Sequence, residues 1–256
     1  MLLLVTGASR GLGKAIAKVA CQHTDRVRAI LVARSASGLL ETEESMKREG
    51  AQVSRHIMDL QDLDKLDGNI DDLIQDLMLD DASYDNVVLI NNAGTIGHVG
   101  SFLTSPSLDN LRNNIDLNVT SALWFSIRFA QYIKAKHQKQ RATIVNISSL
   151  VAVADFPTMA AYSAGKAARE KYHTIMSKEI GADDEGIKIL NYAPGPLETD
   201  MVTEIRSSAE LDGDLRPHFE KKLLDPEDSA GKLIKLLLSN EFESGSHVDY
   251  YDLPDE

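Results

Sequence analysis

A tyrosine and a lysine lie four residues apart in the second half of the chain, at Tyr162 and Lys166. On a helix this spacing places both side chains on one face. An ammonium beside a phenol favours the phenolate, so we expect Lys166 to lower the pKa of Tyr162 from its usual value near ~10. Such a tyrosine can exchange a proton with a carbonyl or alcohol oxygen. A solvated helical pair is the alternative, and it is the commoner meaning of this motif when it stands alone.

A serine hydroxyl is placed where it could join this pair. Ser149 follows the apolar run 142–147, which the sequence predicts to be a buried strand. Open parallel sheets bind ligands at the carboxyl ends of their strands, which is the position expected for Ser149. The predicted catalytic group therefore combines a hydroxyl, a phenol and an ammonium.

The elements that must position these groups alternate along the chain. Strands are predicted at residues 2–6, 29–33, 52–58, 86–90, 143–147, 187–192 and 247–251. Helical patterns follow Gly13 and cover residues 36–49, 61–80, 107–139, 162–180 and 226–238, whereas residues 194–224 show no clear periodicity. This alternation predicts an α/β protein with a Rossmann-type, doubly wound parallel sheet of about seven strands and helices on both faces. We expect a single domain over residues 1–256, with a cofactor half at about 1–140 and a catalytic and substrate half at about 141–256.

Composition narrows the classes of function. The chain has 256 residues, of which 43% are hydrophobic and 26% charged, as in soluble globular proteins. A net charge of −12 argues against a general nucleic-acid or anionic-membrane surface. Cys21 is the only cysteine, which excludes an intrachain disulfide, and no signal peptide or membrane-spanning run is seen, so we expect a cytosolic protein. No clustered Cys/His spacing appears, and we assign no metal.

A glycine-rich turn joins the first strand to the first helix. Three glycines occur within the seven residues from Gly7 to Gly13. Strand, glycine-rich turn and helix together predict a phosphate-binding loop, because the backbone can approach a pyrophosphate and the helix N-terminus offers free N–H groups. A tight turn with no ligand is the alternative.

The end of the second predicted strand indicates which dinucleotide would bind. An acid at this place would bond the ribose 2′-hydroxyl of NAD, whereas an arginine suits a 2′-phosphate. Arg34 and Ser35 occupy the place, and Arg10 lies in the glycine-rich turn. Guanidinium forks match phosphate geometry, so we expect NADPH as the cofactor.

Together these motifs resemble the short-chain dehydrogenase/reductase family. They are the loop Thr6–Gly13, the turn Asn91–Gly94, Asn118, the trio Ser149, Tyr162 and Lys166, and the segment Pro194–Thr199. The resemblance implies that Ser149 positions a substrate carbonyl, Tyr162 donates a proton, Lys166 lowers its pKa and holds the nicotinamide ribose, and Asn118 anchors a water that relays protons to Lys166. It also implies a set of cofactor-binding residues, namely Gly7, Ala8, Ser9, Arg10, Gly11, Leu12, Gly13, Arg34, Ser35, Met58, Asp59, Asn91, Ala93, Gly94, Tyr162, Lys166, Leu197, Thr199 and Met201.

A closer resemblance points to one group within that family, the sepiapterin reductases. It is carried by the segments Asn146–Leu150, Ala164–Arg169, Leu190–Met201 and Ser244–Asp252. That group reduces side-chain ketones of pterins with NADPH in tetrahydrobiopterin synthesis. The resemblance implies a homodimer formed through the helices of Trp124 and Tyr162, and substrate contacts from Ser149, Leu150, Tyr162, Gly195, Met201 and Asp249.

Alternatives remain open for the substrate and for Asp249. A broader carbonyl or diketone reductase, such as a benzil reductase, would use the same chemistry, and a non-catalytic NADPH sensor could use the same fold. Asp249 could anchor a pterin ring, or it could be one of several solvated acids near the C-terminus with Asp252, Asp255 and Glu256. In the predicted strand 247–251, Asp249 points to the side opposite Val248.

Overall fold

Seven parallel strands form one sheet within the part of the chain that the structure describes. The structure is a computed structural model, and it describes residues 1–80, 82–104, 107–136, 140–181 and 186–254. The strand order is β3-β2-β1-β4-β5-β6-β7, and every pairing is parallel. The predicted fold class is confirmed. The strands are β1 (Leu2–Thr6), β2 (Arg28–Ala33), β3 (Gln52–Ile57), β4 (Asn86–Asn91), β5 (Arg141–Ile147), β6 (Ile187–Ala193) and β7 (His247–Asp249).

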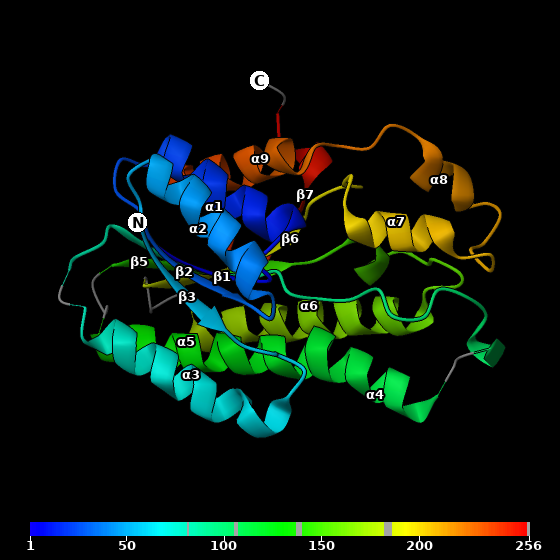
Figure 1. Cartoon of the computed structure of the whole chain (residues 1–256), viewed down its shortest axis with the longest axis horizontal. Helices are drawn as coiled ribbons and strands as arrows, with labels where there is room; N and C mark the ends of the chain where they lie inside the picture. The colour runs from blue at the N-terminus through cyan, green and yellow to red at the C-terminus, as the bar shows by residue number, and fades with distance from the viewer. Residues whose placement is uncertain (81, 105–106, 137–139, 182–185, 255–256) are drawn as a thin grey trace.

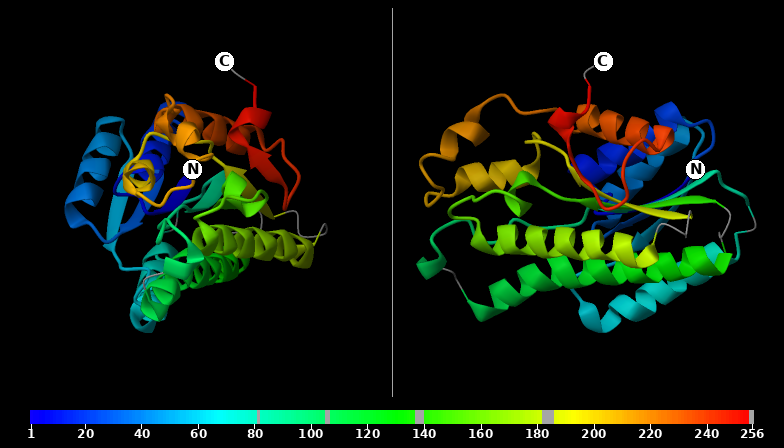
Figure 2. Two further views of the ribbon diagram at one scale, coloured as in Figure 1. Left: turned by 90° about the vertical axis from the view of Figure 1, so that its right-hand side faces the viewer. Right: turned by 180° about the vertical axis from the view of Figure 1, so that it is seen from behind.

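Helices cover both faces of the sheet (Figures 1 and 2). One face packs against α1 (Gly11–His23), α2 (Ala36–Arg48) and α9 (Pro226–Ser239). The other packs against α3 (Leu63–Met78), α5 (Ser121–Lys136) and α6 (Ala160–Ile180). Within the described ranges, none of the helices combines the length and apolar character needed to cross a membrane.

The strands carry apolar side chains on both faces, which explains why helices cover both faces of the sheet. In β1, Leu3 and Val5 belong to the core beneath α1, α2 and α9, whereas Leu2 and Leu4 belong to the core beneath α3, α5 and α6. Successive side chains of a strand point to opposite faces, so an uninterrupted apolar strand must be buried on both. The sheet is therefore inside the molecule, and the edge formed by the carboxyl ends of its strands remains available for a site.

Three segments near that edge differ from the sequence prediction. The helix predicted at 107–139 is interrupted by a π-helical turn (Asp116–Thr120) between α4 (Leu108–Ile115) and α5, and residues 137–139 lie outside the described residues. Residues 194–224, predicted without regular structure, contain α7 (Asp200–Ser207) and α8 (Arg216–Glu220), which lie together at one end of the molecule (Figure 1). The last predicted strand ends at Asp249, where a 3₁₀ turn (Tyr250–Asp252) begins.

Candidate active site

A cleft of about 1380 Å³ runs along the carboxyl edge of the sheet. The turns that follow β1, β2, β4, β5, β6 and β7 all contribute to its wall. Doubly wound sheets bind ligands at this edge. A pocket for one small ligand measures roughly 300–1,000 Å³, so this cleft has room for a nucleotide and a second small molecule.

The turn after β1 has the geometry of a phosphate-binding loop. Gly7 adopts a φ of +68°, a conformation that disfavours other residues. A Cβ atom on Gly13 would lie 2.4 Å from the carbonyl oxygen of Gly7, so α1 can approach the turn this closely only with glycine there. Arg10, at the N-cap of α1, makes no side-chain capping bond. The first N–H groups of α1 therefore have no side-chain cap, which fits the binding of a pyrophosphate.

Two arginines line the cleft beside this loop. Arg10 forms an ion pair of 2.5 Å with Asp200, and Arg34 lies 4.0 Å from Asp59. Both guanidinium groups are more than half exposed, so these pairs are weak and can rearrange around a ligand. Ser35 accepts a hydrogen bond from the Gly38 N–H and so starts α2.

Tyr162 lies buried in the first turn of α6 with its hydroxyl 3.8 Å from the Met201 sulfur. Burial raises the pKa of this phenol to about 12, while the charge of Arg169 and a hydrogen bond to Ser149 act in the opposite direction. The structure thus differs from the prediction that Lys166 lowers the pKa of Tyr162. Desolvation outweighs the nearby cations, and the phenol stays protonated over the physiological pH range.

Lys166 lies one turn further along α6 and is also buried. Its ammonium donates a 2.6 Å hydrogen bond to the carbonyl oxygen of Ile147 and lies 5.5 Å from the centre of the Tyr162 ring. Burial lowers the pKa of Lys166 well below its usual range, Arg169 adds to this effect, and the carboxylate of Glu170 opposes it. The predicted pair therefore exists, with the ammonium held by β5.

Ser149 comes two residues after the end of β5, as predicted. It caps the 3₁₀ turn Leu150–Ala152, where its hydroxyl accepts a hydrogen bond of 3.4 Å from the Val151 N–H. The hydroxyl lies on the cleft wall together with Tyr162 and Lys166. The structure therefore brings the three predicted catalytic groups together.

Four predicted residues do not line the cleft. Ala8 and Gly13 are buried where the glycine-rich turn packs against α1 and α2. Asn91 donates to Ser126 and to the Ala122 carbonyl oxygen, so it braces β4 against α5. Each of the three therefore has a packing position behind the cleft lining, and its assignment to the cofactor site stays a prediction.

Asn118, the fourth, is fully buried in the π-helical turn. Its carboxamide accepts from the Thr95 N–H at 2.9 Å, donates to the Thr95 carbonyl oxygen at 2.8 Å, and donates to Asn114 at 3.1 Å. The Asn118 side chain thus holds the turn after β4 in place, although Asn118 itself does not line the cleft. Its expected role in holding a water beside Lys166 stays a prediction.

The remaining predicted residues do lie on the wall, together with residues that the sequence analysis missed. The predicted ones, besides those already placed, are Ser9, Gly11, Leu12, Met58, Ala93, Gly94, Leu150, Gly195, Leu197 and Thr199. The missed ones form an apolar wall at the α7 and α8 end and include Phe156, Met159, Leu215 and Phe219. Their segments lack a helical or strand period, so only the apolar composition could have marked them.

Asp249 forms part of an ordered turn at the rim of the cleft. Its carboxylate accepts a hydrogen bond of 3.0 Å from the Tyr251 N–H, and its own N–H donates to Asp252 at 2.9 Å. These bonds form a capping box for the 3₁₀ turn. Asp249 is partly buried and Asp252 is exposed, so whether Asp249 anchors a substrate or is a solvated acid stays a prediction, while Asp255 and Glu256 lie outside the described residues. Across the described chain, no three His, Cys, Asp or Glu side chains come together as metal ligands would.

Comparisons with known proteins agree with this geometry. The sequence matches the short chain dehydrogenase family over residues 2–210. It is 37% identical over 265 residues to sepiapterin reductase of Bos taurus, covering 98% of this chain and 94% of the bovine protein. It is 29% identical over 245 residues to benzil reductase ((S)-benzoin forming) of Bacillus subtilis (strain 168), covering 92% and 93%. The structure is similar to that of NAD⁺-bound xylitol dehydrogenase, with a TM-score of 0.80, 20% identity and coverage of 97% and 96%, which shows a shared fold.

Proposed function

Because the chain belongs to the short-chain dehydrogenase family, whose members are oxidoreductases that bind a nicotinamide cofactor, we propose that it is an NADPH-dependent reductase of pterin side-chain ketones. The substrates would be of the sepiapterin or 6-pyruvoyl-tetrahydropterin type, in tetrahydrobiopterin synthesis. One observation carries the proposal: a single cleft is lined by the phosphate-binding loop, by Arg34, by the Tyr162 and Lys166 pair, and by Asp249.

The cofactor half of the cleft supports a phosphorylated dinucleotide. The uncapped start of α1 would hold the pyrophosphate, and Arg10 and Arg34 would hold the 2′-phosphate. Lys166 would bond the nicotinamide ribose. When bound, the cofactor supplies the hydride.

The protein's own groups would bind the ketone and supply its proton. Tyr162, protonated and buried, would donate its proton to the ketone oxygen as charge develops there. Ser149, which lines the cleft together with Tyr162, would hold that oxygen in place. The ammonium of Lys166 would stabilise the phenolate that remains.

The position of Asp249 favours a pterin as the substrate over a ketone that lacks a pterin ring. A pterin presents a 2-amino group and an adjacent ring nitrogen, which are a planar pair of donors. A carboxylate can accept from both, and such charge-assisted bonds contribute about 1.5–3 kcal/mol. One carboxylate oxygen of Asp249 is used by Tyr251, and each carboxylate oxygen can accept more than one bond.

The apolar wall favours a second candidate, a diketone reductase. Phe156, Met159 and Phe219 face the cleft near Tyr162, and aromatic or aliphatic groups of a diketone would pack against them. This candidate needs no contact from Asp249, so the two functions differ in a single testable group.

Initial rates of cofactor oxidation, measured with each carbonyl substrate, distinguish these functions. Sepiapterin and a small diketone would be compared, each with NADPH and with NADH. The proposal expects turnover of sepiapterin with NADPH and a preference for it over the diketone. Turnover of the diketone alone would favour the second candidate, and no turnover with any carbonyl would favour an NADPH sensor.

We also propose that the protein is a homodimer that pairs α5 and α6 with their copies. Tyr172 and Ile175 on α6 are 36% and 40% exposed, which leaves apolar side chains on this helix to pack against a partner. Trp124 on α5 is partly buried and donates to Asp67 at 2.9 Å. Sedimentation at micromolar concentration should give the mass of a dimer, and a monomer alone would contradict the proposal.

A further inference from the structure

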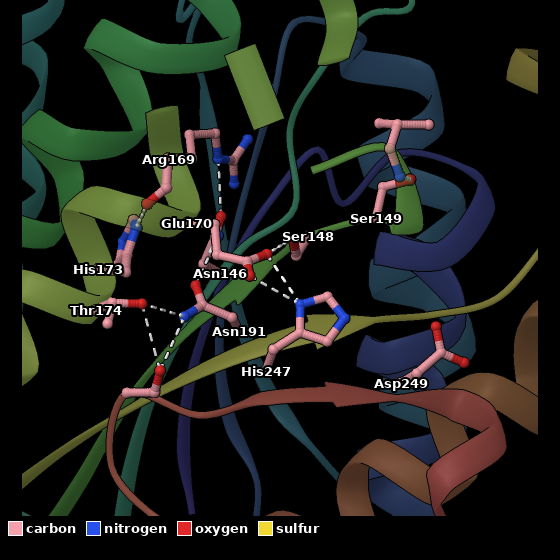
Figure 3. Close-up of polar contacts among 12 residues, drawn as sticks. Asn146, Ser148, Ser149, Arg169, Glu170, His173, Thr174, Asn191, His247 and Asp249 are labelled. Carbon is pink, nitrogen blue, oxygen red and sulfur yellow. Dashed lines mark hydrogen bonds and ion pairs between the residues drawn. The ribbon is translucent and has the colours of Figure 1, made fainter. Parts of the chain in front are cut away.

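A chain of hydrogen bonds joins the end of β5 to β7 through α6. Ser148 donates to one carboxylate oxygen of Glu170. The Nδ1 of His247 lies 2.9 and 3.0 Å from the two oxygens of the same carboxylate. Since a carboxylate only accepts, Nδ1–H of His247 is the donor. Figure 3 shows Ser148 and His247 meeting Glu170, with Asp249 further along β7.

The two ends of this chain adjoin groups on the cleft wall. Ser148 immediately precedes Ser149. His247 and Asp249 are two residues apart on β7, so their side chains leave the same face of the strand. The chain Ser148–Glu170–His247 therefore connects the serine end of the proposed substrate site to its carboxylate end.

The strand that carries Asp249 needs such a connection. β7 has three residues and pairs with β6 through Asn191, Tyr192 and Ala193, and within the described sheet it lies at the edge. A short edge strand makes few backbone bonds, and such elements open at low cost. The bond to Glu170 adds a side-chain anchor on the rigid helix α6.

The charges around this chain strengthen it. Burial is the largest single influence on the Glu170 carboxylate and raises its pKa, but the hydrogen bonds from His247 and Ser148 and the charges of His247 and Lys166 together outweigh burial and lower the pKa. The bond to Glu170 raises the pKa of His247, which Asp249 and Asp252 raise further. Lys166 also faces Glu170 and lowers its pKa. Glu170 is therefore a carboxylate near neutral pH, and His247 can donate to it whether protonated or neutral.

We propose that Glu170 and His247 are positioning residues that hold β7, and with it Asp249, at a fixed place relative to Ser149. A substrate bound at both ends would then have its ketone aligned with Tyr162, and small errors in such alignment cost rate. The identity of that substrate rests on the proposed function, whereas the hydrogen-bonded connection between α6 and β7 does not.

Hydrogen exchange tests the connection without any substrate. His247→Leu should speed exchange of the amides of residues 247–252 by at least about tenfold, while β6 stays protected. His247→Asn, whose amide can donate to Glu170, should restore most of the protection. His23→Leu is the matched control, because His23 is exposed at the far end of α1 and, among the described residues, its ring bonds the Val19 carbonyl oxygen of its own helix. Unchanged exchange in His247→Leu would overturn the proposal.

A double variant tests whether the two residues act as one unit. Glu170→Leu and His247→Leu should each raise exchange in residues 247–252, and the combined variant should raise it no further than Glu170→Leu alone, since that single variant has already lost the bond to His247. Additive effects would show two independent structural roles and overturn the proposal.

Kinetics test the consequence for the substrate. His247→Leu should lower kcat/KM for sepiapterin at least about tenfold, with part of the loss in kcat, leave kcat for a small diketone within about twofold, and leave NADPH binding unchanged. His247→Asn should recover the kcat/KM for sepiapterin. Equal losses on both substrates would assign His247 a general structural role instead. If the wild type reduces no pterin, the proposed function fails, and the exchange experiment still decides whether β7 is held in this way.

Discussion

The ammonium of Lys166 donates a 2.6 Å hydrogen bond to the carbonyl oxygen of Ile147, the last residue of β5. This bond fixes the second turn of α6 against the strand that leads to Ser149. Because the serine follows β5 and Tyr162 precedes Lys166 by one turn, the same contact sets the position of all three groups. The geometry of the proposed site is therefore fixed by the sheet and a single helix.

Tyr162→Phe should abolish most turnover while leaving cofactor binding intact. The change removes the proton donor and little volume from a buried position. General acid catalysis contributes roughly a hundred- to ten-thousand-fold, so kcat should fall by a factor in this range. Tyr84→Phe removes a tyrosine hydroxyl that bonds Asp80. Tyr84 precedes the amino end of β4 and does not line the cleft, so this variant should leave kcat unchanged. Near-normal turnover in Tyr162→Phe would refute the role of proton donor.

Arg34→Asp should reduce the preference for NADPH over NADH. The proposed guanidinium–phosphate contact is a charge-assisted hydrogen bond, whose loss costs about 1.5–3 kcal/mol, or roughly ten- to a hundredfold in Kd for NADPH. Titration of each cofactor by fluorescence measures the change. Arg48→Asp reverses a charge at the exposed end of α2 and should change neither Kd. Equal use of both cofactors by the wild type would contradict the proposed phosphate site.

Patterns that lie close together in sequence predicted most of the fold and much of the site. The apolar strands, the Gly7–Gly13 loop and the Tyr162–Lys166 spacing each depend on neighbouring residues, and the structure places them as predicted. Parallel topology then brings the strand ends to one edge. That is why Ser149 could be placed at the cleft, whereas Asp249, a hundred residues later, was placed there by the resemblance to the sepiapterin reductases.

Contacts between distant segments could not be predicted in the same way. Glu170 and His247 are separated by 77 residues, and no local period marks either of them. The short helices α7 and α8 have eight and five residues, too few to give a clear period, and tertiary packing rather than propensity stabilises such helices. The pKa of Tyr162 was expected in the wrong direction because burial, which outweighs neighbouring charge there, is a property of the fold.

Arg169→Met should destabilise the protein strongly. The guanidinium is fully buried and donates to the carbonyl oxygens of Asn91 and Ala93 and to the Asn146 carboxamide. Methionine fills similar space but leaves these acceptors unsatisfied, at about 1–3 kcal/mol for each buried group. Urea unfolding should show a loss of several kcal/mol, whereas Arg112→Met, at an exposed position on α4, should change stability little. Comparable stabilities of the two variants would show that the Arg169 bonds contribute no net stability.

His173→Gln should remove a pH-dependent part of the stability. Burial lowers the pKa of His173 from 6.5 to about 4, and its Nδ1 donates to the Arg169 carbonyl oxygen. Between pH 6.5 and about 4 the unfolded chain takes up a proton that the folded protein does not, so this contribution is present above pH 6.5 and is lost as pH falls. The free energy of unfolding of the wild type should therefore fall more steeply than that of the variant, by on the order of 3 kcal/mol over this range. His23→Gln, on the exposed end of α1, should follow the wild type.

Asp249→Asn should damage pterin reduction selectively. The asparagine oxygen can still accept from the Tyr251 N–H, so the 3₁₀ turn at the rim should remain. The variant loses the charge that would bind the pterin ring, and its amide presents a donor where the ring also presents donors. Sepiapterin activity should fall at least about tenfold, equivalent to ~1.4 kcal/mol, while small-diketone reduction and NADPH binding stay near normal. Asp252→Asn is the matched control on the same turn and should keep sepiapterin activity. Equal losses on both substrates, or none, would show that Asp249 is not a pterin anchor and would favour the diketone reductase.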